Sequence, residues 1–167
     1  MVLHVRRATP AAPAAALQYT KAASPVEYFE EQAILFGSPT CGFSKIHGLA
    51  AATRQLIDSI RGVALARGDS FSTVGVSLEG PASDGEAWLY EFDKFDELII
   101  GHNWLNSAVV AHIWSDPDAK PAIPQLVLIR RHIRNGQRSI AVGQDSVVRR
   151  WVGVGELAPA VARSLRY

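Results

Sequence analysis

Cysteine is almost absent from this sequence, in which Cys41 is the only one among 167 residues. A single cysteine excludes an intramolecular disulfide and a zinc site built from several thiolates. No apolar stretch approaches the roughly 20 residues needed to span a bilayer. The formal net charge of +1 is too small to predict nucleic acid as the main partner. No metal site is predicted either, because His102, His112, Asp116 and Asp118 do not have a recognised ligand spacing.

The first 25 residues differ in composition from the rest of the chain. They carry three basic residues and no acidic one, and include the low-complexity segment ATPAAPAAAL. We expect residues 1–25 to be a flexible or partner-docking arm and residues 26–167 to form one domain. A transit peptide, or the remnant of an export or anchor segment, has a similar composition. The compartment is therefore left open between cytoplasmic, organellar and extracytoplasmic.

Apolar patterning predicts strands that alternate with helices in the first half of the domain. Residues 32–38 and 71–80 are short apolar runs typical of buried strands, and residues 26–32 fit a short strand or a helical turn. From Gly42 to Gly68 apolar residues recur every three or four positions, which predicts an amphipathic helix. Ser83 and Glu86 stand in capping-box register and predict the start of a second helix. A short strand at 97–101 and a short helix at 103–114 follow.

The second half predicts a strand hairpin and a closing helix. Residues 125–133 are predicted to form the first strand of the hairpin, and Asn135 and Gly136 are a strong turn signal. Residues 138–143 are predicted to form the returning strand. Residues 155–167 are typical of a helix. A right-handed parallel crossover followed by an antiparallel hairpin gives an α/β fold with a mixed central sheet flanked by helices. The hairpin carries the basic residues Arg130, Arg131, His132, Arg134 and Arg138. They favour a solvated edge strand. Docking of an acidic partner or of anionic lipid is the alternative.

Two segments of the chain resemble the thioredoxin superfamily over about residues 30 to 166. PTCGFSK, residues 39–45, stands where that family has its CxxC redox motif, with Cys41 as the first cysteine and Ser44 in place of the second. AIPQLVLI, residues 122–129, is similar to the segment in which a cis-proline, here Pro124, opens a strand and faces the thiol. The resemblance implies a thioredoxin-like sheet.

The string CGFS is also the signature of monothiol glutaredoxins. However, Cys41 and Pro124 are 83 residues apart, farther than in those compact proteins. The chain looks more like the longer redoxin-type members used in extracytoplasmic thiol reduction.

The order of strand, turn, thiol and helix predicts a reactive Cys41, because unpaired N–H groups at a helix N-terminus favour the thiolate. We expect Lys45 to add positive potential, Gly42 to permit close approach of a partner and Phe43 to offer an apolar contact. Ile123 and Pro124 are expected to position the partner chain by strand pairing. A hydroxyl at Ser44 can hydrogen-bond the thiolate but cannot resolve a mixed disulfide.

We therefore predict monothiol thiol–disulfide exchange through Cys41, with a protein or a small thiol as partner and no required cofactor. Glutathione is a candidate co-substrate. One alternative is a redox-inactive thioredoxin-like scaffold or assembly subunit, and another is a glutathione-dependent [2Fe–2S] carrier. Ser44 as an engineered replacement of cysteine also stays open. Glu79 is expected to be an exposed acid at a strand end, with proton acceptance near the site as the alternative.

Overall fold

The computed structural model describes residues 26–78, 80–136 and 139–164. The predicted arm, Glu79 and Arg138 lie outside these residues. The elements in chain order are β1 (Val26–Gly37), the 3₁₀ turn η1 (Gly42–Lys45), α1 (Leu49–Ala66), β2 (Ser70–Ser77), α2 (Ala82–Phe92), β3 (Glu97–Ile100), the 3₁₀ turn η2 (Asn103–Leu105), α3 (Ser107–Val109), the π-helical segment η3 (Val110–Trp114), β4 (Gln125–Asn135), β5 (Ile140–Val142), β6 (Ser146–Val152) and α4 (Val154–Ser164).

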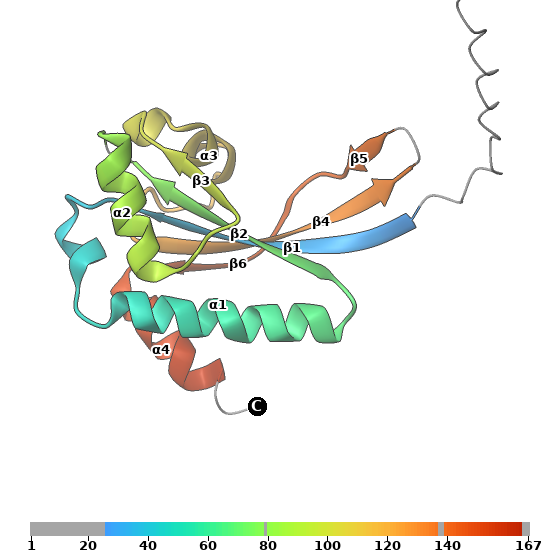
Figure 1. Cartoon of the computed structure of the whole chain (residues 1–167), viewed down its shortest axis with the longest axis horizontal. Helices are drawn as coiled ribbons and strands as arrows, with labels where there is room; N and C mark the ends of the chain where they lie inside the picture. The colour runs from blue at the N-terminus through green and yellow to red at the C-terminus, as the bar shows by residue number, and fades with distance from the viewer. Residues whose placement is uncertain (1–25, 79, 137–138, 165–167) are drawn as a thin grey trace, which may run out of the picture.

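The strands form one mixed sheet in the order β3-β2-β1-β4-β5, with β6 also paired to β4 (Figure 1). β1, β2 and β3 are parallel, whereas β4 is antiparallel to β1, and β5 and β6 are antiparallel to β4. The parallel strands β1, β2 and β3, the antiparallel strands that follow and the terminal helix agree with the mixed sheet flanked by helices that the sequence predicts. The mixed α/β fold class is confirmed.

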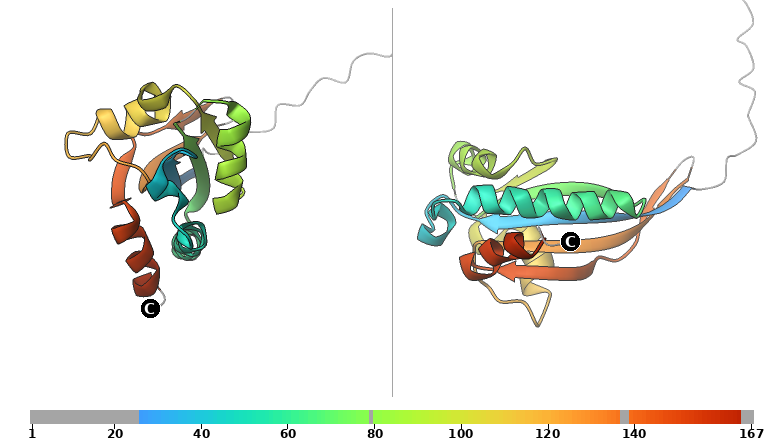
Figure 2. Two further views of the ribbon diagram at one scale, coloured as in Figure 1. Left: turned by 90° about the vertical axis from the view of Figure 1, so that its left-hand side faces the viewer. Right: turned by 90° about the horizontal axis from the view of Figure 1, so that it is seen from below.

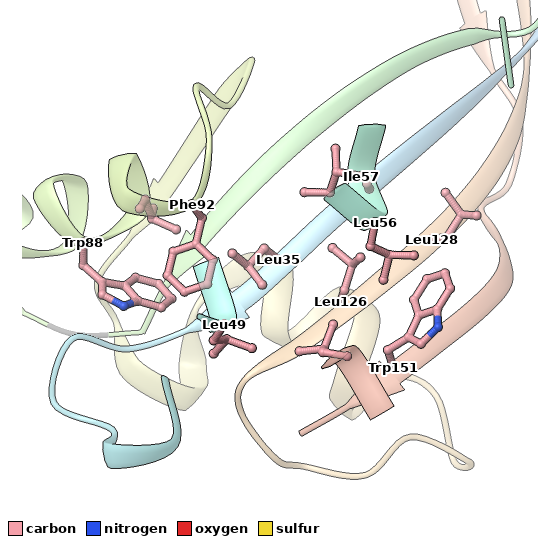
Figure 3. Packing of buried hydrophobic residues seen from close by; sticks show 12 residues of the cluster. Leu35, Leu49, Leu56, Ile57, Trp88, Phe92, Leu126, Leu128 and Trp151 are labelled. Atoms are coloured by element: carbon pink, nitrogen blue, oxygen red, sulfur yellow. The ribbon is translucent and has the colours of Figure 1, made fainter. Parts of the chain in front are cut away.

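Helices cover both faces of the sheet, which is why the middle of β1 is a continuous apolar run. Leu35 points into a core shared with α1, α2 and α4, and this cluster includes Leu56, Trp88 and Trp151 (Figure 3). The neighbouring Phe36 points to the opposite face, where α3 and η3 provide the cover. The views in Figure 2 show these helices on the two sides of the long sheet.

The secondary structure differs from the predicted elements in several places. Residues 26–32 are not a separate element, because β1 is continuous from Val26 to Gly37. The capping box is wrong: α2 begins after Pro81, and Ser83 lies inside its first turn with its hydroxyl on the Asp84 carboxylate. β6 was not predicted, because only Trp151 in it is buried and the segment therefore has no apolar alternation.

Among the described residues of the basic hairpin, the arginines are not free along an edge. β4 is an interior strand, paired with β1 on one side and with β5 and β6 on the other. Three of its described arginines form ion pairs with acids of β1 and of the α1–β2 junction, namely Arg130 with Asp69, Arg131 with Glu30, and Arg134 with Glu27. The prediction of an edge strand is therefore wrong, and these pairs account for much of the positive charge that suggested docking.

Among the described residues, no helix combines the length and the apolar character required to cross a membrane.

The burial of Phe36 predicts a large stability effect. Phe36 is 0% exposed, so Phe36→Ala should lower the free energy of unfolding by about 3–5 kcal/mol in urea denaturation. Phe43→Ala is the matched control, since Phe43 is 67% exposed and its truncation should change stability by less than about 0.5 kcal/mol. Equal effects of the two changes would contradict the core assignment.

Candidate functional site around Cys41

The pairing of β1 with β4 brings Cys41 beside the Ile123–Pro124 segment. Phe36, near the end of β1, pairs with Gln125 at the start of β4, so the segments that follow β1 and precede β4 lie next to each other. Cys41 Sγ lies 3.9 Å from the carbonyl oxygen of Ile123, across 82 residues of sequence. The Ile123–Pro124 peptide bond is cis. Cys41 is half-buried.

Cys41 does not stand at the N-terminus of the long helix, so that part of the prediction is wrong. It precedes η1, a four-residue turn in which Ser44 N–H donates to the Cys41 carbonyl at 3.0 Å. Ile46 is extended and Gly48 has a left-handed φ of 81°, which favours glycine, so α1 begins only at Leu49. The alignment of peptide dipoles in α1 is therefore several residues away from the thiol.

The Ser44 side chain points into the protein and not toward the Cys41 sulfur, with which a hydrogen bond was expected. It is 3% exposed, and its hydroxyl oxygen accepts a long hydrogen bond from the backbone N–H of Ser38 at 3.4 Å. Among the described residues, no hydrogen bond joins the Ser44 hydroxyl to the Cys41 thiol. Ser44 therefore stabilises the turn that carries Cys41, and the expectation of a direct hydrogen bond to the sulfur is wrong.

The outer side of the turn is exposed. Phe43 and Ile46 are 67% and 42% exposed, and Gly42 and Lys45 are exposed as well. These residues follow Cys41 directly in the chain and are open to solvent. The contacts expected of Gly42, Phe43 and Lys45 with a partner stay a prediction.

The loop before β4 is held by three hydrogen bonds that the sequence did not reveal. Gln125 is fully buried and its side-chain amide donates to the carbonyl oxygens of Ala122, at 2.6 Å, and Lys120, at 3.4 Å. The carbonyl of Pro124 accepts from the backbone N–H of Gly153 at 2.8 Å. These bonds fix the loop while the Ile123 carbonyl faces the thiol.

Trp88 of α2 is the second residue that sequence reasoning did not connect to the site. Trp88 is buried at 4% exposure, and no pattern within its own segment indicates that it touches the turn around Cys41. Its indole N–H points at the Ser44 carbonyl at 3.5 Å. A Cβ built on Gly37 would lie 2.2 Å from Cη2 of Trp88, so the indole occupies the space that any larger residue at position 37 would need.

No family model matches the chain, and no curated protein matches it either. One solved structure with a detectable likeness is a secreted Mycobacterium tuberculosis disulfide oxidoreductase homologous to E. coli DsbE. It is 15% identical, with 80% of this chain and 81% of that chain covered, at a TM-score of 0.36. A likeness at this level carries no argument about the chemistry of this chain.

A polar hollow of about 610 Å³ lies on the α3 side of the sheet, away from the thiol. It is lined by η3 and by the segment joining β5 to β6, with His112, Asp116, Arg131, Asp145 and Arg150 contributing the ionisable groups. Arg150 donates to the Asp116 carboxylate and to the His112 carbonyl, both at 2.6 Å. Across residues 26–78, 80–136 and 139–164, no cluster of three His, Cys, Asp or Glu side chains could hold a metal ion.

Burial lowers the pKa of His112 from its usual 6.5. The Asp145 carboxylate opposes this shift, whereas the charges of Arg150 and Arg131 reinforce it. The folded chain therefore favours the neutral imidazole.

The lowered pKa predicts a loss of stability in mild acid. Below pH 6.5 the unfolded chain binds a proton at His112 before the folded chain does, so the free energy of unfolding falls as the pH is lowered. His112→Gln removes this titration and should flatten the dependence between about pH 5 and pH 7. Urea denaturation of both proteins across that range tests the prediction, and parallel pH profiles would contradict it.

Proposed function

We propose that the chain carries out monothiol thiol–disulfide exchange through Cys41, with Ile123 and Pro124 aligning an extended partner chain. The observation that carries the proposal is the 3.9 Å contact between Cys41 Sγ and the Ile123 carbonyl oxygen, beside a cis peptide bond. Among the described residues, the Ile123 N–H has no hydrogen-bond partner. A partner backbone can therefore pair with this residue as an added strand.

The exchange proceeds in two stages, and the second stage requires external thiols. Cys41 loses its proton to solvent, and its thiolate attacks one sulfur of the partner's disulfide. A mixed disulfide with Cys41 forms, and the other partner sulfur leaves as a thiolate that is then protonated. Two external thiols, for which we propose glutathione, next reduce the mixed disulfide and are oxidised to one disulfide. Cys41 returns as a thiol and the partner's disulfide is reduced to two thiols.

A chromogenic peptide disulfide tests this proposal directly. The peptide carries one cysteine capped with thionitrobenzoate, so attack by Cys41 releases the chromophore and leaves the peptide on the protein. Two backbone hydrogen bonds to the peptide, each worth about 1 kcal/mol, should make folded wild type react more than about tenfold faster than the chain in urea. The rate of chromophore release and the mass of the adduct are measured.

Cys41→Ala is the control and should give neither chromophore nor adduct. Parallel measurements with free N-acetylcysteine correct for the effect of urea on the intrinsic reaction. A folded chain that reacts no faster than the unfolded one would refute the proposal.

Ser44→Cys should convert the monothiol site into a dithiol site. The hydrogen bond from Ser44 N–H to the Cys41 carbonyl closes a turn, and such turns keep the two α-carbons within about 7 Å. That distance is close to the upper range for a disulfide. Oxidised Ser44→Cys should therefore show no free thiol. The reduced variant, once Cys41 has bonded to the peptide, should release the peptide as a thiol by forming this internal disulfide, with no external thiol.

Ser139→Cys is the matched control for the added thiol. Ser139 lies in the β4–β5 hairpin, beyond the last residue of β4. Cys41 lies near the first residue of β4, and the two ends of this strand are about 33 Å apart. This variant should keep two free thiols and retain the peptide. Retention of the peptide by Ser44→Cys would contradict the assigned geometry of the turn.

A redox-inactive scaffold is the second candidate, and the short turn after Cys41 is the observation that favours it. η1 has four residues, so its few aligned peptide dipoles provide little stabilisation of a thiolate. In that case the exposed Phe43 and Ile46 would serve partner binding without chemistry. The folded-against-unfolded comparison above separates the two candidates, because a scaffold requires no acceleration at Cys41.

A further inference from the structure

Trp88 contacts both ends of the turn that carries Cys41. At the first end, the edge of the indole lies against the backbone of Gly37, the last residue of β1. At the second end, the indole N–H points at the carbonyl of Ser44. Trp88 is 4% exposed, and it packs edge to face against Phe92 with ring centroids 4.8 Å apart. The indole is thus held by the core while it touches the turn.

Several hydrogen bonds of the turn are local. The Cys41 N–H donates to the Ser38 carbonyl at 3.2 Å, and the Ser38 N–H donates to the Ser44 hydroxyl. These bonds set the shape of the turn. One further bond reaches the start of the turn from Leu78, the residue after β2, whose N–H donates to the Gly37 carbonyl. Of these contacts, only those of Trp88 join both ends of the turn to α2.

We propose that Trp88 is a positioning residue. By contacting Gly37 and Ser44, the indole keeps the two ends of the turn at a fixed separation and so sets the position of Cys41 relative to the Ile123 carbonyl. This inference rests on the proposed exchange function. The steric contact with Gly37 contributes more than the 3.5 Å hydrogen bond, which is longer than the usual 2.7–3.2 Å range for an N–H donor. Shrinking the indole should therefore loosen the turn without removing the thiol.

Loosening the turn should affect two reactions of Cys41 differently. Alkylation by iodoacetamide needs only an accessible sulfur, so it should continue at a similar or higher rate. Exchange with the peptide disulfide also needs the sulfur in register with Ile123 and Pro124. Since a misplacement of about 1 Å can cost on the order of 100-fold in rate, the ratio of peptide exchange to alkylation reports position, separately from overall stability.

Trp88→Phe is the first test, made in the full chain under conditions where the protein is folded by circular dichroism. The phenyl ring still fills most of the space in the core, but it is too short to contact both Gly37 and the Ser44 carbonyl. We expect the exchange-to-alkylation ratio to fall by about tenfold. Gly37→Ala is the second variant, because the new Cβ must displace Trp88 from the other side, and it should lower the same ratio.

Trp151→Phe is the matched control. Trp151 is 6% exposed and belongs to the same core cluster, but it comes from β6 and lies on the far side of that cluster from Trp88 (Figure 3). The same chemical change there should leave the ratio unchanged. An unchanged ratio in both Trp88→Phe and Gly37→Ala would overturn the proposal, as would an equal fall in Trp151→Phe.

Tryptophan fluorescence gives a readout that does not depend on exchange. Alkylation of Cys41 should change the emission of wild type and of Trp151→Phe, but not that of Trp88→Phe, because Trp88 touches the turn that the modification perturbs. If wild type exchanges no faster than the unfolded chain, the proposed function fails, and this signal then decides the positioning role alone. A fluorescence change that persists in Trp88→Phe would contradict the role in either case.

Discussion

The antiparallel ladder between β1 and β4 is the constraint on which the rest of the site depends. It runs from the pair Val26 and Asn135 to the pair Phe36 and Gln125. Because the strands are antiparallel, the end of β1 lies beside the start of β4, and the short segments beyond that last pair must meet. Cys41 and Ile123 are thus neighbours although 82 residues separate them. A slip of one residue in this register would turn Leu35 and Phe36 to the wrong faces of the sheet, so the two cores that flank β1 also fix the site.

Local patterns account for what the sequence could predict. The apolar runs in β1, β2 and β4 identify strands covered on both faces, and apolar residues every three or four positions identify the amphipathic helix α1. The expectation that Cys41 would face Pro124 did not come from these patterns. It came from the resemblance to a family, because no periodicity within one segment specifies a contact between two distant segments.

The predictions that failed depended on information outside the segment itself. β6 carries mostly exposed residues, and its strand conformation depends on pairing with β4. The arginines of β4 looked like a basic surface until the register placed Glu30 opposite Arg131 and Glu27 opposite Arg134. The apolar period of α1 continues back through Ile46, but the left-handed Gly48 interrupts the helix. Charge and periodicity therefore indicate which elements exist, whereas strand pairing decides which surfaces stay free.

Ser44 shows why the missing second cysteine is more than a lost nucleophile. Its side chain is buried under the turn, where the hydroxyl accepts from Ser38 and the carbonyl faces Trp88. The residue is thus part of the internal support of the turn, while Phe43 and the half-buried Cys41 form its outer side. The inner side of the turn thus supports Cys41. Because position 44 is serine and supplies no second thiol, the proposed exchange takes its resolving thiol from outside the turn.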